Sequence, residues 1–600
     1  MKFIRIVSIV LPLLFSIIHS SNHVAPYIGL RSMSVDAARE LVGWANNYHI
    51  HLYNNCNLYT SFAITTEYTH SFDGQRIARN LFGSDLVSVA GSNRPVIKIS
   101  GSQVANRAAT DWLADYFGLP TDFQSTFSTH PTVDNLVVDF NYYLALNDWW
   151  RGLYFRMHAP VVHTRWDLNY CENITNLGTL GYNPGYFNDE LLGTPRDNLL
   201  QSFEDYISGQ RAPILEGSVS FEALQKAKMS PKRLVKTCLA ELEVVLGWDI
   251  WQAALYHFGI NCRAAFPSGN RPQGEYLFEP IVGNGHAWVI GAGISTHYQF
   301  WTDECTRTAG VYIDANFTHL FSARQGRIFD IDSGGNSRYM LGAKVDVPVS
   351  NSLQGPGGNL ATGQFQNLLR PLANLTTFNV DVTIGMQTDI VILLDCTLGG
   401  LSMDLAYNFW SHNCERITVR NNCPPQFTND TVFALKGDAY LFAFDVANAN
   451  EPVALSSTER LATIHAGTNT PIGTTFTPAQ TLNPNIDNPQ LAFGDTGLGV
   501  QTLYANSLGI NQQRTSIQPI VLNPNQLNTQ GARTKGLSNR VIAHISYTWN
   551  EHCTWIPFIG CGGFAEFVPN FDILCSRDCT CIRTNINQWG VWLKGGASFN

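Results

Sequence analysis

The sequence has no apolar run long enough to cross a bilayer as a helix, which takes roughly 20 residues. Its one sustained apolar stretch, Ile6–Ile18, follows Lys2 and Arg5 and is followed by two serines. A basic start, a short apolar stretch and small residues after it are typical of a secretory signal peptide, which we assign to residues 1–20. If the mature chain, residues 21–600, enters a membrane, it must do so as a closed barrel, because hydrocarbon offers backbone groups no other partners.

Charge is scarce as well. Charged residues make up 14% of the chain, against about 25% in ordinary soluble domains. Few charges among many neutral polar residues suit strands that have one face in lipid and the other in water. The net charge of -9 argues against nucleic acid as a partner, because phosphate contact needs a basic surface. The chain also has no phosphate-loop or dinucleotide fingerprint, so no cofactor is expected.

What the chain does contain is repeated runs in which apolar and polar residues alternate with a period of two. Many runs exceed the about five or six residues of a soluble strand and approach the roughly nine to eleven that a tilted strand needs to cross a bilayer. We therefore predict an all-β fold, a transmembrane antiparallel β-barrel of roughly 12–16 strands, with an even number favoured. An alternating strand in a soluble sandwich is the alternative. The runs are Leu58–Tyr68, Leu136–Leu144, Phe155–Val161, Leu242–Ile250, Trp288–Phe300, Phe378–Met386, Leu401–Phe409 and Val541–Trp549.

Helices and loops are expected in the remaining segments. Ser34 can cap a helical run over Val35–Asn47, and a second helical run covers Gln103–Phe117. Residues 21–133 are thus predicted to hold the first strand and the helical elements of a single barrel. Long polar stretches are predicted to be loops, and the longest of them, residues 448–538, is rich in Asn, Thr and Gln. The other two are Asp167–Thr237 and Ser322–Thr376.

Charged residues on the polar faces of the runs are candidates for the barrel interior. Acidic and basic groups that face one another across a pore set a filter of size and charge. The alternative is a salt-bridged, filled interior that conducts nothing. The candidate lumen-facing residues are Asp139, Arg156, His158, Glu241, Glu243, Asp249 and Asp381.

Aromatic residues gather near the ends of the runs, where amphipathic rings suit the headgroup level of a bilayer. The candidate girdle residues are Trp149, Trp248, Trp251, Trp288, Tyr298, Trp301, Tyr547 and Trp549.

The final run is similar to the C-terminal strand signature of bacterial outer-membrane barrels, in which a terminal aromatic follows alternating apolar residues. Trp589, Val591, Leu593 and Phe599 share one face. The aromatic is penultimate here, which departs from that signature. The resemblance implies the barrel-assembly machinery as a partner.

The 13 cysteines are disulfide candidates in an exported chain, with one left over or reduced. Three groups are close enough in sequence to staple local loops. One of these, the C-terminal cluster, lacks neighbouring histidines and a second ligand pair at zinc spacing, so no metal site is expected. The groups are Cys553 with Cys561, Cys414 with Cys423, and the cluster of Cys575, Cys579 and Cys581.

Cys262, His286 and Asp314 are the best candidates for a hydrolytic triad, because a thiol nucleophile needs a base and a group that orients the base. Cys262 follows an extended run rather than opening a helix, where a thiolate would be stabilised. His286 stands at the start of an alternating strand. These positions favour a structural role, so no catalytic residue and no enzyme activity are predicted.

Several segments resemble a family of large, uncharacterised outer-membrane β-barrel proteins of the intracellular bacterial candidate phylum Dependentiae. The resemblance runs through most of the mature chain. It implies a barrel fold and an outer-membrane location, and it brings no substrate or catalytic residue with it. The segments are Ala114–Asp122, Met157–Tyr170, Asn261–Gly291 and Gln588–Phe599.

The sequence thus predicts a barrel in the bacterial outer membrane, reached after cleavage of a signal peptide. The predicted function is a porin-like channel for passive diffusion or uptake of small solutes, with outer-membrane lipid as its surroundings. Two alternatives are a surface-exposed structural or adhesion barrel without conduction and a secreted thiol hydrolase.

Overall fold

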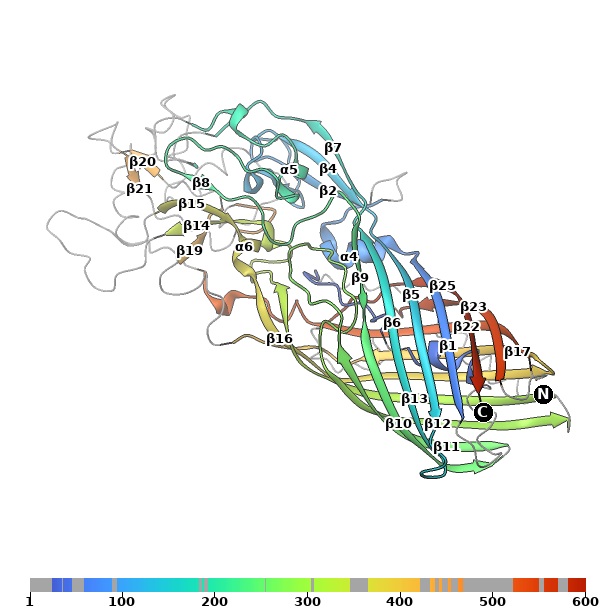
Figure 1. Ribbon diagram of the computed structural model, residues 1–600. Helices are drawn as coiled ribbons and strands as arrows, with labels where there is room; N and C mark the ends of the chain where they lie inside the picture. The colour runs from blue at the N-terminus through green and yellow to red at the C-terminus, as the bar shows by residue number, and fades with distance from the viewer. Residues whose placement is uncertain are drawn as a thin grey trace.

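The computed structural model describes residues 24–34, 36–45, 59–88, 94–182, 186–187, 193–253, 255–303, 307–345, 365–420, 432–437, 442–444, 452–454, 462–467, 522–549, 555–569 and 581–599. The predicted signal peptide, residues 1–20, lies outside these ranges. Long strands close into a barrel, and shorter elements gather beyond one of its ends (Figure 1).

A closed antiparallel barrel of 12 strands forms the body of the molecule. Each strand hydrogen-bonds to the next, and the pairings of β25 with β1 and of β10 with β6 complete the ring. The prediction of an antiparallel β-barrel with an even number of strands is confirmed. In ring order the strands are β1 (Thr60–Ser71), β5 (Thr132–Ala145), β6 (Leu153–Asp167), β10 (Glu241–Ala253), β11 (Tyr256–Pro267), β12 (Val289–Asp303), β13 (Arg307–Ile328), β16 (Thr377–Leu398), β17 (Leu401–His412), β22 (Thr534–Thr548), β23 (Trp555–Phe567) and β25 (Gln588–Phe599).

The period of two in the sequence puts apolar side chains outside the barrel and polar side chains inside it. Leu405 is 56% exposed and Leu593 is 54% exposed, whereas Glu67 and Arg540 are both 0% exposed. A soluble protein buries its apolar residues and leaves its charges in water. The barrel wall has the opposite distribution, which is that of a strand with one face in hydrocarbon.

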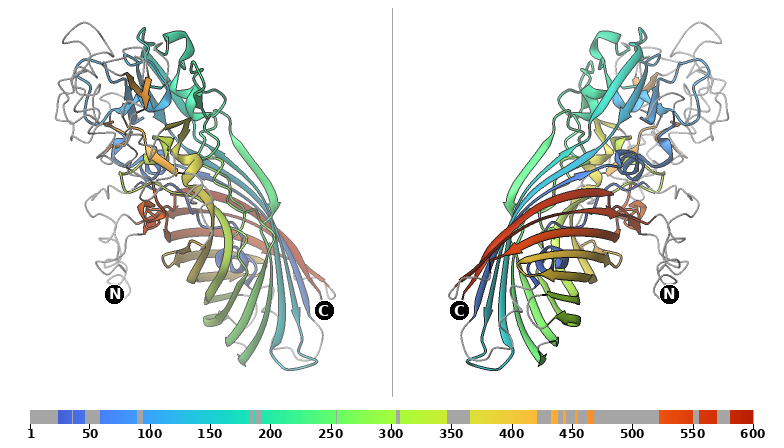
Figure 2. Two further views of the ribbon diagram at one scale, coloured as in Figure 1. Left: turned by 90° about the vertical axis from the view of Figure 1, so that its left-hand side faces the viewer. Right: turned by 90° about the vertical axis from the view of Figure 1, so that its right-hand side faces the viewer.

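The two ends of the barrel differ. At one end, β5–β6, β10–β11, β12–β13, β16–β17 and β22–β23 are joined by short turns. At the other end, every connection is long, and the described parts of these connections form a folded layer that we call the cap (Figure 2). The connections are residues 72–131, 168–240, 268–288, 329–376, 413–533 and 568–587.

The cap contains three small sheets and several short helices. One sheet has the order β3–β2–β4–β7, a second has the order β19–β14–β15–β8, and β20 pairs with β21. Among the described residues, no helix is long and apolar enough to cross a membrane. The strands are β2 (Val96–Ser100), β3 (Trp112–Leu113), β4 (Gln124–Thr129), β7 (Tyr170–Asn176), β8 (Ser220–Phe221), β9 (Leu234–Leu239), β14 (Leu341–Val345), β15 (Phe365–Pro371), β18 (Arg416–Thr418), β19 (Val432–Leu435), β20 (Phe442–Phe444), β21 (Pro452–Ala454) and β24 (Ile582–Arg583). The helices are α4 (Gly74–Phe82), η2 (Gly83–Asp85), η3 (Ala114–Phe117), η4 (Arg196–Asn198), α5 (Phe203–Ile207), η5 (Ser337–Tyr339), α6 (Leu372–Thr376) and η9 (Pro524–Gln526).

An aromatic cluster holds the cap together. The ring of Trp112 lies 6.3 Å from that of Phe82, 6.0 Å from that of Phe203 and 5.8 Å from that of Tyr339. These four residues come from four elements, α4, β3, α5 and η5, which belong to three of the connections. All four are fully buried. The cap therefore has a hydrophobic core of its own, as a soluble domain does.

Both predicted helices differ from the structure. The first is shorter than predicted: α2 covers only Ala37–Leu41, and Asp36 rather than Ser34 caps it. Over 103–117 the prediction of a helix is wrong, because the segment forms turns, β3 and η3. The buried Arg107 donates to the carbonyl oxygens of Ser100 and Asp111, and these tertiary bonds hold the turns against the local helical preference.

All three predicted loops hold regular structure where the structure describes them. Asp167–Thr237 contains β7, η4, α5 and β8 and the start of β9. Within Ser322–Thr376, β13 continues to Ile328, and β14, β15 and α6 follow. Most of residues 448–538 lies outside the described residues, and β22 begins within this range at Thr534.

The predicted local disulfides are wrong where they can be examined. Cys414 pairs with Cys581, 167 residues away in sequence, and not with Cys423. Cys561 is a free, exposed thiol, so it does not pair with Cys553. Cys575 and Cys579 lie outside the described residues. The start of β22 pairs with the end of β17 on one side and with β24, directly after Cys581, on the other, a proximity that sequence spacing alone cannot reveal.

We expect Cys414→Ser to lower the free energy of unfolding by about 2–4 kcal/mol, because this cross-link closes a long loop of the unfolded chain. Thermal melting measured by circular dichroism would detect the change. Cys561→Ser is the matched control, since this thiol has no disulfide partner. Equal melting temperatures for the two variants would contradict the assignment.

Candidate functional site

The interior of the barrel is occupied by the N-terminal segment, residues 24–45, which we call the plug. At the cap end, Ala25 donates to the carbonyl of Asn80, and Ala25 and Ile28 pack in the cap core. At the short-turn end, the indole of Trp44 donates to Ser61 at the start of β1, 2.9 Å away. The plug therefore runs through the lumen from the cap to the short-turn end (Figure 2).

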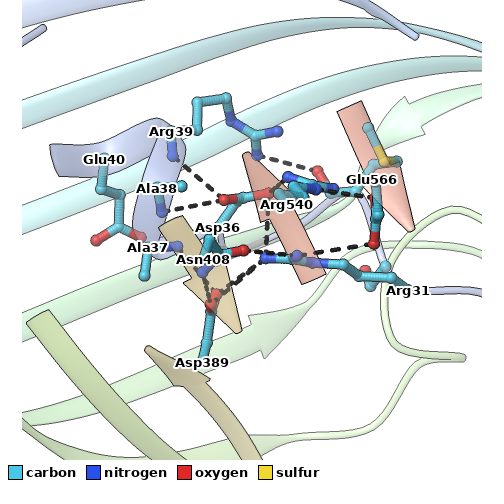
Figure 3. A network of polar contacts seen from close by, with 12 residues as sticks. Arg31, Asp36, Ala37, Ala38, Arg39, Glu40, Asp389, Asn408, Arg540 and Glu566 are labelled. Carbon is cyan, nitrogen blue, oxygen red and sulfur yellow. Dashed lines mark hydrogen bonds and ion pairs between the residues drawn. The ribbon is translucent and has the colours of Figure 1, made fainter. Parts of the chain in front are cut away.

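Asp36 is the centre of the contacts between plug and wall (Figure 3). Its Oδ1 accepts from the backbone N–H groups of Ala38 and Arg39, which caps α2. Its Oδ2 pairs with Arg540 of β22, and Arg540 Nε also lies 2.8 Å from Glu566 Oε2 of β23. One carboxylate thus starts the helix and ties it to the barrel.

Arg31 of the plug completes this network. Its Nη1 donates to Asn408 Oδ1 at 2.8 Å, and its Nη2 lies 3.3 Å from Asp389 Oδ2. Asp389 Oδ2 also accepts from the backbone N–H of Ala37 at 3.0 Å. Because each charge is buried beside an opposite charge, the network avoids the high cost of an isolated buried ion.

A second set of contacts holds the other side of α2. Arg39 Nε lies 2.7 Å from Asp139 Oδ2 of β5, and its Nη1 lies 3.3 Å from Glu67 Oε2 of β1. The ammonium group of Lys594 in β25 donates to the carbonyl oxygens of Arg39 and Val42, which lie at the helix C-terminus. The plug is therefore bound to strands on several sides of the barrel.

Six of the predicted lumen residues are buried inside the barrel. Asp139 pairs with Arg39 and His158, and His158 also faces Glu40 of the plug. Arg156 lies 3.9 Å from Glu40, and Glu243 lies 3.4 Å from Arg263. The other two buried residues are Glu241 and Asp249.

Asp381 does not face the lumen. It pairs with the exposed Arg420 at 2.5 Å. Its neighbours Val380 and Val382 were expected on the apolar outer face but are buried in the cap core. The pairing of β13 with β16 shifts register twice near Leu320, and such irregularities change which residues face inward.

The predicted girdle residues are all exposed, between 37% and 80%. Trp288 precedes β12 at the cap end. The others lie in or near the short turns: Trp149, Trp248, Trp251, Tyr298, Trp301, Tyr547 and Trp549. In β25, the residues of the predicted C-terminal signal, Trp589, Val591, Leu593 and Phe599, are exposed on the outer face.

The candidate triad is not assembled. Cys262 is exposed on the outer face of the wall, whereas Asp314 is buried. His286 Nδ1 contacts the carbonyl of Gly269 at 3.1 Å. A nucleophile and an orienting carboxylate on opposite sides of a barrel wall cannot act on one base.

On the side of β10–β13, polar groups face the lumen without a protein partner among the described residues. They include both carboxylate oxygens of Asp249, Oδ1 of Asp314, Oε2 of Glu243 and Oδ1 of Asn261. Buried polar groups in native proteins are nearly always hydrogen-bonded, to water where no protein group is present. This side of the lumen is therefore suited to hold water or ions.

The sequence did not single out the plug, and of its wall partners it named Asp139, Arg156 and His158 but missed several others. Among those missed, Glu67, Lys594 and Asp404, which accepts from the backbone N–H of Gly43, occupy polar-face positions in alternating runs, and that pattern was the available signal. Nothing in the order of the chain shows that residues 24–45 return into the lumen. The fold and the lumen together define a 12-stranded β-barrel with an apolar exterior and an interior closed by its own N-terminal segment.

No family model and no curated protein matches the chain. An outer membrane channel from Pseudomonas putida F1 is 7% identical, covers 90% of this chain and 95% of its own, and gives a TM-score of 0.28. A FadL homologue from Pseudomonas aeruginosa is 5% identical, with 98% and 99% covered and a TM-score of 0.24. The translocator domain of the autotransporter NalP from Neisseria meningitidis is 5% identical, with 94% of each chain covered and a TM-score of 0.18. Scores this low do not establish a shared fold, so the barrel assignment rests on the strand pairing.

We expect Arg540→Gln to loosen the plug. The change removes one of the two cations, Arg540 and Arg31, that Asp36 and Glu566 share, and breaking a buried pair in this way costs about 3–5 kcal/mol. Trypsin should then cleave after Arg39, whose side chain is fully buried in the wild-type protein, and mass spectrometry would detect the fragments. Arg307→Gln, at an exposed pair with Asp303, should leave Arg39 protected. If Arg39 is as well protected from trypsin in Arg540→Gln as in the wild-type protein, the ion-pair network does not hold the plug in place.

Proposed function

We propose that the protein is an outer-membrane β-barrel that passes small solutes through a lumen closed at rest by its plug. The observation that carries the proposal is the distribution of side chains: an apolar exterior encloses a charged interior in which the plug is held by ion pairs. The proposal has three parts, which are the membrane, the gate and the selectivity for cations.

The dimensions of the wall support a membrane location. β1 is 12 residues long, and at ~3.3 Å per residue with a tilt of about 40° it rises roughly 30 Å, close to the thickness of a hydrocarbon core. Outer-membrane barrels have short turns on the periplasmic side and long connections outside. By this rule the cap faces the exterior of the cell.

The plug is held by ion pairs and hydrogen bonds and also by an apolar cluster, in which Ala37, Leu41 and Trp44 pack with wall residues such as Tyr143 and Phe564. The charged contacts are the part of this interface that a gate can use. Charged groups that lose their partners can be hydrated when water enters, so a displaced plug would leave a lumen wall that water wets. A cavity of about 80 Å³ already lies beside Tyr27–Met33, which is room for several water molecules. The resting state is closed because the paired charges are more stable together than apart.

The charges on the β10–β13 side favour cations. Glu241, Glu243, Asp249 and Asp314 are buried there, and the buried arginines of the same four strands are Arg263 and Arg327, of which Arg327 already pairs with Glu415. Excess carboxylates in a low-dielectric channel raise the local concentration of cations.

A surface barrel that does not conduct is the second candidate. The observation in its favour is the cap, which has a hydrophobic core of its own and accounts for much of the described chain. In this alternative the barrel anchors the cap, and the plug is a permanent filling.

Leu405→Arg tests the membrane location. Leu405 lies in the middle of β17 and is 56% exposed, so an arginine there would stand in hydrocarbon and cost about 2–4 kcal/mol. We expect a lower yield of heat-modifiable, folded protein in bilayers. Ile214→Arg is the control, since Ile214 is 71% exposed but lies in the cap, in the connection between β6 and β10. Equal folding yields for both variants would contradict a membrane-embedded wall.

Planar-bilayer recording tests the gate. Wild-type protein should show rare openings, and Arg540→Gln or a chain lacking residues 24–42 should conduct far more often. In a salt gradient the reversal potential should be displaced from zero toward the equilibrium potential of the cation. Glu243→Gln together with Asp249→Asn should move it back toward zero. Folded variants that never conduct would leave the surface barrel as the function.

A further inference from the structure

We propose that two arginine-rich patches at the boundary of barrel and cap bind the phosphate groups of lipids in the leaflet on the cap side. The β6 patch consists of Arg165 and Arg233, and the β16 patch consists of Arg324, Arg416 and Arg420. The inference rests on the membrane location proposed above and goes beyond it by naming the lipid chemistry that the protein selects.

The β6 patch begins where the apolar outer face of β6 ends. Met157 and Val161 are exposed apolar residues on that face, and Arg165 is the first exposed cation beyond them. β9 pairs with this part of β6, so that Arg165 lies opposite Val235 of β9 on one side and opposite Asp134 of β5 on the other. Arg233 stands two residues before Val235, directly before β9 begins, and strand pairing therefore brings it to the edge of the apolar surface near Arg165.

The guanidinium groups of the β6 patch are only partly engaged. Arg165 Nε donates to His163 at 3.0 Å, and Arg233 Nε lies 3.4 Å from Asp167. Among the described residues, no acceptor contacts the Nη atoms of either arginine. These are the atoms with which arginine forms paired hydrogen bonds to phosphate oxygens.

The β16 patch is built in the same way on another part of the ring. Phe321 is the last exposed apolar residue of β13 before Arg324. Arg324 lies opposite Asp381 of β16, and Arg416 of β18 lies opposite Thr383. Arg420 pairs with Asp381, and the strand register places Arg324 and Arg416 on the same face of this region.

The short-turn end lacks such an excess among the described residues. Arg307 pairs with Asp303, and Arg151 has Asp148 close by in the same turn. That end presents mainly aromatic rings. Because only the cap end concentrates cations at the edge of the apolar surface, the two leaflets would be recognised differently.

A lipid fits these patches better than a free anion does. Each cation lies next to exposed apolar residues, Val161 and Val235 at the β6 patch and Phe321 at the β16 patch. A ligand with a phosphate group and acyl chains contacts both kinds of surface at once, whereas inorganic phosphate contacts only the charges. Juxtamembrane cations attract anionic headgroups within a Debye length.

The test uses the full mature chain in phosphatidylcholine nanodiscs that contain a minor fraction of phosphatidylglycerol. Native mass spectrometry counts the lipids that stay bound. We compare wild type with R165Q/R233Q, with R324Q/R416Q/R420Q, and with R151Q/R307Q as the matched control at the short-turn end. Heat-modifiable migration shows that each variant is folded.

We expect wild type and the control to retain phosphatidylglycerol preferentially, and each patch variant to lose about fivefold or more of this preference. An unchanged preference in both patch variants, or an equal loss in the control, would overturn the proposal. So would full displacement of the lipid by inorganic phosphate, since that outcome indicates a general anion surface. If folded wild type does not stay in nanodiscs, the membrane location fails together with this inference. If it stays but shows no lipid preference, only this inference fails.

Discussion

The buried ion pair between Asp36 and Arg540 is the contact on which the rest of the lumen depends. A carboxylate in the interior of a barrel is stable only beside a cation or water, because transfer of an isolated ion out of water is very costly. Asp36 meets this need and at the same time caps the helix of the plug. The same residue thus fixes the local structure of the plug and its position against the wall.

The pairing is reciprocal, which explains why the interior can be so rich in charge. Arg31 and Arg39 of the plug neutralise Asp389, Asp139 and Glu67 of the wall. Without the plug these carboxylates would need water or other cations. In the proposed gate, a closed lumen and a lumen that water can enter are two states of this one set of charges.

The two ends of the molecule differ because the connections between strands are short at one end and long at the other. Short turns at one end leave little except aromatic rings at the edge of the barrel. Long connections at the other end supply enough residues for a cap with its own core, and they also carry the cations that border the apolar wall. The cap and the two proposed lipid-binding patches thus lie at the same end of the barrel, and the plug enters the lumen from that end.

The sequence by itself determined the wall. Alternation with a period of two identified strands such as β5, β17 and β22, because neighbouring side chains of a strand point to opposite sides whatever the rest of the fold does. The tertiary structure decided what local patterns cannot express. Residues 103–117 have helical spacing, but the buried Arg107 holds them in turns. Val380 and Val382 alternate like membrane residues, yet a register shift places them in the cap core. Cys414 pairs with the distant Cys581. The entry of the plug into the lumen likewise depends on contacts between residues hundreds of positions apart, such as Asp36 and Arg540. Such contacts depend on how the barrel closes, and closure is a property of all its strands together.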